Sequence, residues 1–277
     1  MKRKVKWKNV ILFVFMLIFL SVFIYSGCKI ICRLKEKKDT NKLIDNINSL
    51  IEVKEDIGDT STIDEAIIEN KSEEEKINYY YDYLKVSFLD VDFSKLKDIN
   101  NEVKGWISVV GADVNYPYVQ TTDNSYYLYH SFEKTKNIGG WVFLDYRNNS
   151  DNSDKNTIIY AHGGLSFAMF GPLKKLYDNT NWYLNKDNHY IKVAVENYNF
   201  VYKVFSLYVI DTTNDYLKIN FNSEVKYREF LDMLVNRSHY KFDTDVDSSD
   251  SIITLSTCYN KKQKLVIHAK LIKKIKR

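Results

Sequence analysis

The 277-residue chain is 45% hydrophobic and 27% charged, so it can bury a sizeable core and is not disordered as a whole. Nine Gly and two Pro exclude collagen-like and proline-rich chains, and three Cys are too few for a disulfide framework. The net charge of +4 is unevenly distributed, because residues 1–38 hold ten Lys or Arg and one acid while the rest is net acidic. This asymmetry indicates a membrane-flanking segment and excludes a nucleic-acid partner as the reason for the basic charge.

The first predicted element is a membrane anchor. Residues 10–28 contain no charged side chain, and a helix of that length extends about 28 Å, close to the roughly 30 Å of a hydrocarbon core. Five basic residues precede this run. We therefore expect a basic cytoplasmic N-terminus over 1–9 and a single transmembrane helix over 10–28, with the body of the protein outside the cytoplasm.

Two other interpretations of this segment stay open. A cleaved signal peptide has a shorter apolar run and a small-x-small cleavage site, which the sequence lacks. The ending Ser26-Gly27-Cys28 resembles a lipoprotein box, although Tyr25 stands where an aliphatic residue is expected. Cys28 and Cys32 are four residues apart and share one helix face, which suits packing or acylation better than catalysis.

A helical stalk and an acidic linker are expected over 29–76. Apolar residues recur at helical spacing over 33–57, and residues 58–76 are polar and acidic. Short helices are predicted over 77–86 and over 91–100, the second with Ser94 as its N-cap.

From Gly105 onward, short aromatic and β-branched runs bounded by Gly, Asn or Asp predict strands. These runs are 105–110, 115–120, 139–146, 156–162, 189–196, 199–211, 251–258 and 264–272. One helix capped by Ser223 is predicted over 223–236, and a shorter helical piece over 170–178. About eight strands with few helices predict a mainly β domain over 77–277, built as a closed or nearly closed barrel.

Several familiar signatures are missing from the sequence. It contains no G-x-G-x-x-G, no Walker A motif and no H-E-x-x-H, and its five His do not fall at metal-ligand spacing. We therefore expect neither a metal nor an organic cofactor.

Two residues stand at the ends of predicted strands. Cys258 ends the run 251–258 and is followed by a turn with Lys261 and Lys262, and His162 follows the strand that ends at Ala161. A positive field favours the thiolate of Cys258, and the pair suits a Cys nucleophile with a His acid and base. The alternative is a core Cys that behaves as a small hydrophobe, and the pattern alone does not show that the two residues meet.

The run T-L-S-T-C (254–258) followed by K-L-V-I-H-A-K-L-I (264–272) resembles the end of a sortase. The similarity extends backwards through 169–176, 158–162, 141–148, 116–130 and 105–107, in the same order. The helix expected over 223–236, between the last barrel strands, is typical of class B sortases. The resemblance implies an eight-stranded sortase-type β-barrel with N-terminal helices.

The resemblance also implies a function: a membrane-anchored cysteine transpeptidase on the outer face of a Gram-positive bacterium. Cys258 would attack a Thr carbonyl in the C-terminal sorting motif of a secreted protein and form a thioacyl-enzyme. An amine of the peptidoglycan cross-bridge, or of its lipid-linked precursor, would then resolve that intermediate. His162 would first protonate the leaving amine and then deprotonate the incoming one.

The family's substrate groove corresponds here to Asn124, Leu128, Thr212, Tyr216, Leu217 and Ser256. One position departs from the family, since Lys264 stands where sortases have a substrate-holding Arg. Lys supplies the charge but not the planar two-pronged fork of Arg. We nevertheless expect a working enzyme, in which Lys264 serves in place of that Arg. The rivals are a weak or inactive sortase-like module that binds sorting signals or cell wall, and a structural domain with Cys258 in its core.

Overall fold

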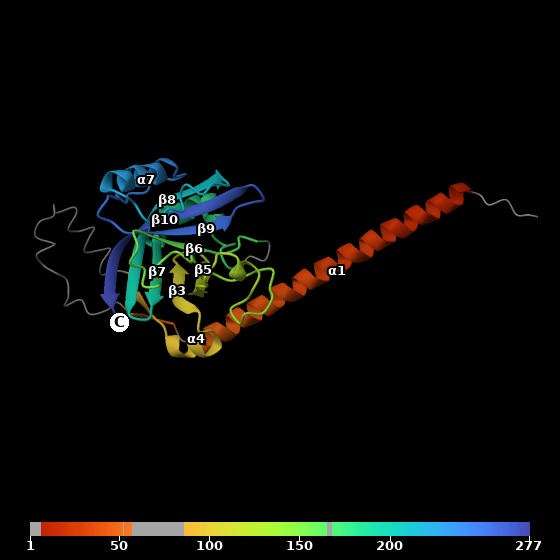
Figure 1. The fold of residues 1–277 in the computed structure, drawn as a ribbon, viewed down its shortest axis with the longest axis horizontal. Coiled ribbons are helices and arrows are strands. Elements are labelled where there is room, and N and C mark those ends of the chain that lie inside the picture. Colours follow the sequence, from red (N-terminus) through yellow and green to blue (C-terminus); the bar gives the residue numbers. More distant parts are fainter. Residues whose placement is uncertain (1–6, 52, 57–85, 165–167) are drawn as a thin grey trace, which may run out of the picture.

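The computed structural model describes residues 7–51, 53–56, 86–164 and 168–277. The acidic linker expected over 58–76 lies outside these residues, as does the helix expected over 77–86 except for its last position. Figure 1 shows a barrel from which one long helix extends.

That helix, α1 (Trp7–Leu50), is continuous over the residues expected to form an anchor and a separate stalk. It is the one helix of the described part of the chain that is long and apolar enough to cross a membrane. Its apolar side chains over residues 10–25 are exposed, whereas Leu43, Ile47 and the following Ile51 are buried against the rest of the protein. One end of α1 is therefore fixed to the barrel, and the other extends away from it (Figure 1).

Eight strands form a closed barrel, as the sequence predicts. In chain order they are β3 (Val103–Val109), β4 (Val114–Val119), β5 (Phe143–Leu144), β6 (Asn156–Tyr160), β7 (Tyr190–Val195), β8 (Tyr198–Asp211), β9 (Ile252–Cys258) and β10 (Gln263–Lys276). The order around the barrel is β10-β8-β7-β3-β4-β5-β6-β9, and a separate pair joins β1 (Lys54–Asp56) to β2 (Phe88–Asp90).

Each of the eight predicted runs overlaps one barrel strand, but in run 139–146 only the two residues of β5 form a strand. Gly140 has a φ of +58°, and the positive φ ends any extended conformation at that point. A Cβ on Gly140 would also lie 2.4 Å from the Tyr127 carbonyl oxygen. The backbone is therefore folded against residue 127 before the strand begins.

The helices are short apart from α1 and α7 (Glu224–Asn236), which Ser223 caps as expected. The N-cap of α4 (Phe93–Ile99) was predicted wrongly, because Asp92 and not Ser94 holds that position. The Asp92 carboxylate accepts a hydrogen bond from the Ser94 N–H at 3.0 Å, which places Ser94 in the first turn. The remaining helical segments are α5 (Lys174–Tyr177), α6 (Thr180–Leu184), and the 3-10 turns η2 (Tyr126–Leu128) and η3 (Lys186–Asn188).

The core fills the barrel with alternating inward side chains, including Trp106, Ile159, Leu207, Leu255 and Ile267, all fully buried. A second apolar cluster lies outside the barrel, where Phe230 and Leu234 of α7 pack against Tyr208 of β8. The site described next lies at one end of β6 and β9, two strands that pair in parallel.

Candidate active site

The parallel pairing of β6 with β9 brings the two predicted catalytic residues to the same end of the barrel. Tyr160 is in register with Ser256, so two residues further along each strand direction stand His162 and Cys258. Their neighbours are in contact, because the Thr257 hydroxyl donates to the Ala161 carbonyl oxygen at 2.8 Å. The parallel register thus brings His162 and Cys258 to neighbouring strand ends, although they are far apart in the chain.

Gly163 allows the ends of β6 and β9 to approach each other closely. A Cβ at this position would lie 2.3 Å from the Cys258 carbonyl oxygen, a distance that real Cβ atoms essentially never show. The backbone after His162 therefore lies directly against the backbone of Cys258. A side chain at residue 163 would force the two strand ends apart.

Lys264 stands directly opposite Cys258 in the antiparallel register of β9 and β10. Side chains of such a cross-strand pair project from the same face of the sheet. The Lys264 Nζ lies 3.0 Å from the Cys258 Sγ, and both side chains are half-buried. An ammonium group at this distance stabilises the negative charge of a thiolate.

The orientation of the His162 ring is set by Leu128, a predicted groove residue. The Nε2 of His162 lies 2.8 Å from the Leu128 carbonyl oxygen. Since a carbonyl only accepts, Nε2 carries the hydrogen, and the neutral ring has its lone pair on Nδ1. The Tyr129 ring packs edge-on against the imidazole at 6.4 Å between centroids. Nδ1 is consequently the nitrogen that can take up a proton.

Lys174 also lies at this site, although no sequence pattern points to it. A Cβ on Gly163 would lie 2.7 Å from the Lys174 Cε, so the lysine stem lies beside the backbone contact of residues 163 and 258. Burial lowers the pKa of Lys174, and the nearby Cys258 acts in the opposite direction. The segment 169–176 contributed to the family resemblance, but no periodicity links a Lys on α5 to a Cys on β9.

Two of the predicted groove residues, Tyr216 and Ser256, are hydrogen-bonded to each other near Cys258. The hydroxyl groups of Tyr216 and Ser256 are 3.0 Å apart, and both residues are almost fully buried. Burial raises the pKa of Tyr216 above its ordinary value, so its hydroxyl stays protonated near neutrality. Their buried hydroxyl pair therefore joins β9 to the segment that follows β8.

The other groove residues lie on surrounding loops. Asn124 accepts a hydrogen bond from the Tyr146 N–H at 3.0 Å, which joins the loop before η2 to the end of β5. The Thr212 hydroxyl donates to the Lys262 carbonyl oxygen at 2.9 Å, at the β9–β10 hairpin. The structure thus distributes these residues over separate loops.

A buried carboxylate links several of these elements and was also missed. Asp145 is fully buried and accepts hydrogen bonds from the Arg147 Nη2 at 2.7 Å and the Tyr160 hydroxyl at 2.8 Å. Burial opposes the charge, but the hydrogen bonds from Arg147 hold the pKa of Asp145 below its usual range. Arg147 also donates to the carbonyl of Leu217 at 3.2 Å, and so ties that groove residue to β5.

Two other histidines are placed for structural roles. His268 is buried on the side of β10 that faces the second apolar cluster, between the Tyr208 hydroxyl at 3.0 Å and the Thr254 hydroxyl at 2.9 Å, and burial lowers its pKa to about 3. His189 is buried as well, and bonds through its ring nitrogen to the Tyr183 carbonyl. Among residues 7–51, 53–56, 86–164 and 168–277, no three His, Cys, Asp or Glu side chains are grouped to hold a metal ion.

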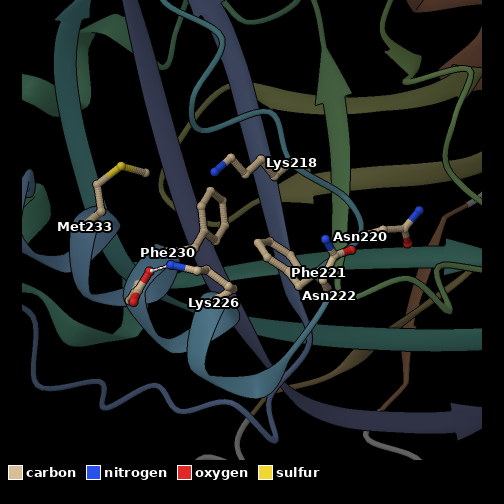
Figure 2. A pocket seen from close by; sticks show the side chains of 8 residues that line it. Lys218, Asn220, Phe221, Asn222, Lys226, Phe230 and Met233 are labelled. Atoms are coloured by element: carbon tan, nitrogen blue, oxygen red, sulfur yellow. Dashed lines mark hydrogen bonds and ion pairs between the residues drawn. The ribbon is translucent and has the colours of Figure 1, made fainter.

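A separate open hollow of about 490 Å³ lies between α7 and the segment 218–222 (Figure 2). Phe221 and Phe230 pack at 4.9 Å between ring centroids, and Lys226 pairs with Glu229 along the rim. None of the predicted site residues lines this hollow. This hollow is therefore separate from the site at the end of β6 and β9.

Comparison with known proteins is consistent with this geometry. The family model of the sortase domain matches residues 107–272. Sortase B of Listeria monocytogenes is 29% identical over 269 residues, which cover 93% of this chain and 95% of that protein. The solved sortase B–substrate complex of Staphylococcus aureus is 32% identical, with a TM-score of 0.60 over 65% of this chain and 84% of that one. A crystal structure of sortase B complexed with triglycine is similar to the same degree, with 32% identity and a TM-score of 0.60 over 66% of this chain and 85% of that one.

Proposed function

The chain belongs to the sortase family, as a cysteine transpeptidase of the class B type, and we propose that Cys258, His162 and Lys264 carry its reaction. The observation that carries this proposal is the 3.0 Å contact between the Lys264 Nζ and the Cys258 Sγ. This contact lies at the end of β9, beside the end of β6 that His162 follows. A buried core Cys would have no such cationic partner.

In the first half of the reaction, the Cys258 thiolate attacks the carbonyl carbon of a Thr in a sorting motif. A C–S bond forms and the carbonyl oxygen becomes an oxyanion. When the oxyanion collapses, the C–N bond of the motif breaks, and protonated His162 gives its proton to the leaving amine. The Nδ1 of His162 is the nitrogen that suits this transfer, because Nε2 is held by Leu128.

In the second half, an amine attacks the thioester carbonyl. A new C–N bond forms, the C–S bond breaks, and His162 takes the proton that the amine loses. Cys258 is thereby released as the thiolate that Lys264 stabilises. The S. aureus relative was solved with a substrate and another sortase B with triglycine, which supports a sorting-motif substrate and an amine acceptor for this chain.

Lys264 is proposed to take the part of the family Arg. While the thiolate is free, the ammonium neutralises it, and during attack the same charge faces the developing oxyanion. Lys has one compact ammonium in place of a planar fork, so it stabilises charge without binding the substrate in two places. The weak or inactive sortase-like module remains the rival, and the 3.0 Å contact favours the enzyme.

The expected location follows from α1. The helix is a candidate membrane anchor, and we propose that residues 10–28 span the membrane once, with the N-terminus cytoplasmic and the barrel outside. The cluster of basic residues before the apolar run supports this orientation. Secreted proteins with a sorting motif would then be joined to a cell-wall amine at the outer face.

A panel of fluorogenic sorting-motif peptides tests the proposal. The full chain in detergent is expected to cleave at least one peptide. When triglycine is added, the share of hydrolysed peptide should fall and the share of peptide–triglycine conjugate should rise. Cys258→Ala and His162→Ala are expected to abolish both products. Cleavage that persists in Cys258→Ala would refute the mechanism, and wild type that binds a peptide without cleaving it would favour the binding module.

A further inference from the structure

The hollow between α7 and the segment 218–222 adjoins the predicted substrate groove through the chain itself. The groove residues Tyr216 and Leu217 are followed directly by Lys218, which lines the hollow. No predicted groove residue lines the hollow, so groove and hollow are neighbouring surfaces and not one cavity. A peptide that leaves the groove along this segment would pass over the hollow.

The segment that separates the groove from the hollow is fixed on both sides. The Asn156 side-chain amide donates to the Lys218 carbonyl oxygen at 2.8 Å, and the next residue, Ile219, is buried. Further back, the Arg237 guanidinium forms two hydrogen bonds to the Asp215 carboxylate, at 2.6 and 2.9 Å. The hollow therefore keeps its position relative to the groove.

The lining of the hollow combines apolar side chains with unbonded amides. Phe230 is buried, and Phe221 and Met233 are half-buried (Figure 2). Asn220 and Asn222 are exposed, and their side-chain amides make no hydrogen bond within the part of the chain that the structure describes. Because such an amide both donates and accepts, it matches the N–H and C=O groups of an extended peptide.

Lys218 gives the hollow an unpaired positive charge. The other charged residues of the lining, Lys226 and Glu229, pair with each other at 2.7 Å. The Lys218 side chain is exposed, and among the described residues no acceptor contacts its ammonium group. The electrostatic complement of this hollow is therefore an anionic group, which in a polypeptide is the carboxylate of Asp or Glu.

The two halves of the proposed reaction indicate which part of a substrate lies on this side. The leaving amine departs and is replaced by the acceptor, whereas the acyl part stays bonded to Cys258 through both halves. A groove wall that is fixed in position suits the part that stays. That part is the chain before the scissile bond, so the chain that continues from the groove toward the hollow precedes the sorting motif.

We propose that the hollow binds an acidic segment of the secreted protein, just before its sorting motif. The inference rests on the proposed function, since it adds a second contact for the same substrate. Lys218 pairs with a carboxylate of that segment, and Asn220 and Asn222 bond to its backbone. The apolar surfaces of Phe221 and Met233 contact the aliphatic parts of its side chains. None of these groups touches the reacting atoms, so the contact contributes to binding and not to the chemical step.

The test uses the full chain in detergent and three peptides that share one sorting motif. One peptide carries a run of Asp and Glu before the motif, one carries a run of Asn and Gln there, and one carries the acidic run after the scissile bond. The variant is Lys218→Gln, which removes the charge and keeps the carbonyl oxygen that Asn156 binds. Lys241→Gln is the matched control, because Lys241 is exposed and does not line the hollow.

In wild type, the peptide with the acidic run before the motif is expected to have a KM about fivefold lower than the neutral peptide, at equal kcat. This factor is near the upper limit for a solvent-exposed ion pair, and it should shrink at high salt. The acidic run after the scissile bond should not lower KM. The difference between the acidic and neutral peptides should disappear in Lys218→Gln and persist in Lys241→Gln.

Two results would overturn the inference and leave the proposed function standing, provided that cleavage still depends on Cys258. One is an equal KM for the acidic and neutral peptides in wild type, and the other is an undiminished difference in Lys218→Gln. With equal KM values, tighter binding of the anionic glycan heparin to wild type than to Lys218→Gln would assign the hollow to a glycan instead. Wild type that cleaves none of the three peptides would overturn both the inference and the proposed function.

Discussion

Replacement of Lys264 by Met removes the charge beside the thiol and keeps most of the stem. Two opposite unit charges at the 3.0 Å separation of Nζ and Sγ attract by about 1.4 kcal/mol in bulk water and about 5.5 kcal/mol at an effective dielectric constant near 20. Both side chains are half-buried, so the true value lies between these limits. Loss of a single oxyanion donor in other enzymes costs about 100- to 1000-fold. We expect kcat/KM of Lys264→Met to fall by that factor.

The assay follows single-turnover release of the leaving peptide, which isolates thioacyl formation from transfer to the amine. Lys261→Met, a charge-matched change at an exposed position of the same hairpin, should leave the rate within twofold of wild type. Lys264→Arg keeps the charge and should stay within tenfold of wild type or exceed it. A Lys264→Met rate equal to that of Lys261→Met would refute the role given to this ammonium.

Three further predictions concern the surroundings of the site. Lys174→Met should slow thioacyl formation by about tenfold, because a half-buried cation beside Cys258 is lost. Lys175→Met, its exposed neighbour, should not slow it in the same single-turnover assay. Gly163→Ala should lower thermal stability by about 1–3 kcal/mol, since its Cβ would lie 2.3 Å from a carbonyl oxygen. Gly164→Ala, whose Cβ meets nothing within 4 Å, should change it by less than about 0.5 kcal/mol. Because the pKa of His268 falls from 6.5 unfolded to about 3 folded, its share of stability is complete above pH 6.5 and is lost toward pH 3, at up to about 1.4 kcal/mol per pH unit. Unfolding of His268→Gln measured between pH 6.5 and 4 should show a slope shallower by this amount, and an unchanged slope would contradict the assignment.

The strands of the barrel were predictable because runs of β-branched and aromatic residues are bounded by Gly, Asn or Asp, as in the run 105–110, which begins at Gly105 and is followed by Gly111. The closed order of the strands was not visible in any one run. It depends on which edges meet, and β6 and β9 are parallel neighbours although almost a hundred residues separate them. The helix cap at residue 92 was missed because Asp and Ser both suit an N-cap. Only the backbone conformation shows that the helix begins directly after Asp92.

For the site, the sequence by itself identified a thiol and an imidazole at the ends of two strands, and the resemblance to sortases added Lys264 opposite the thiol. These residues could be identified from the sequence because each stands at the end of a strand or belongs to a contiguous motif. Lys174 and the Asp145–Arg147 pair were decided only by the tertiary structure. Each of them joins segments that are distant in the chain, and local periodicity reports only which face a residue occupies, not which distant segment covers that face.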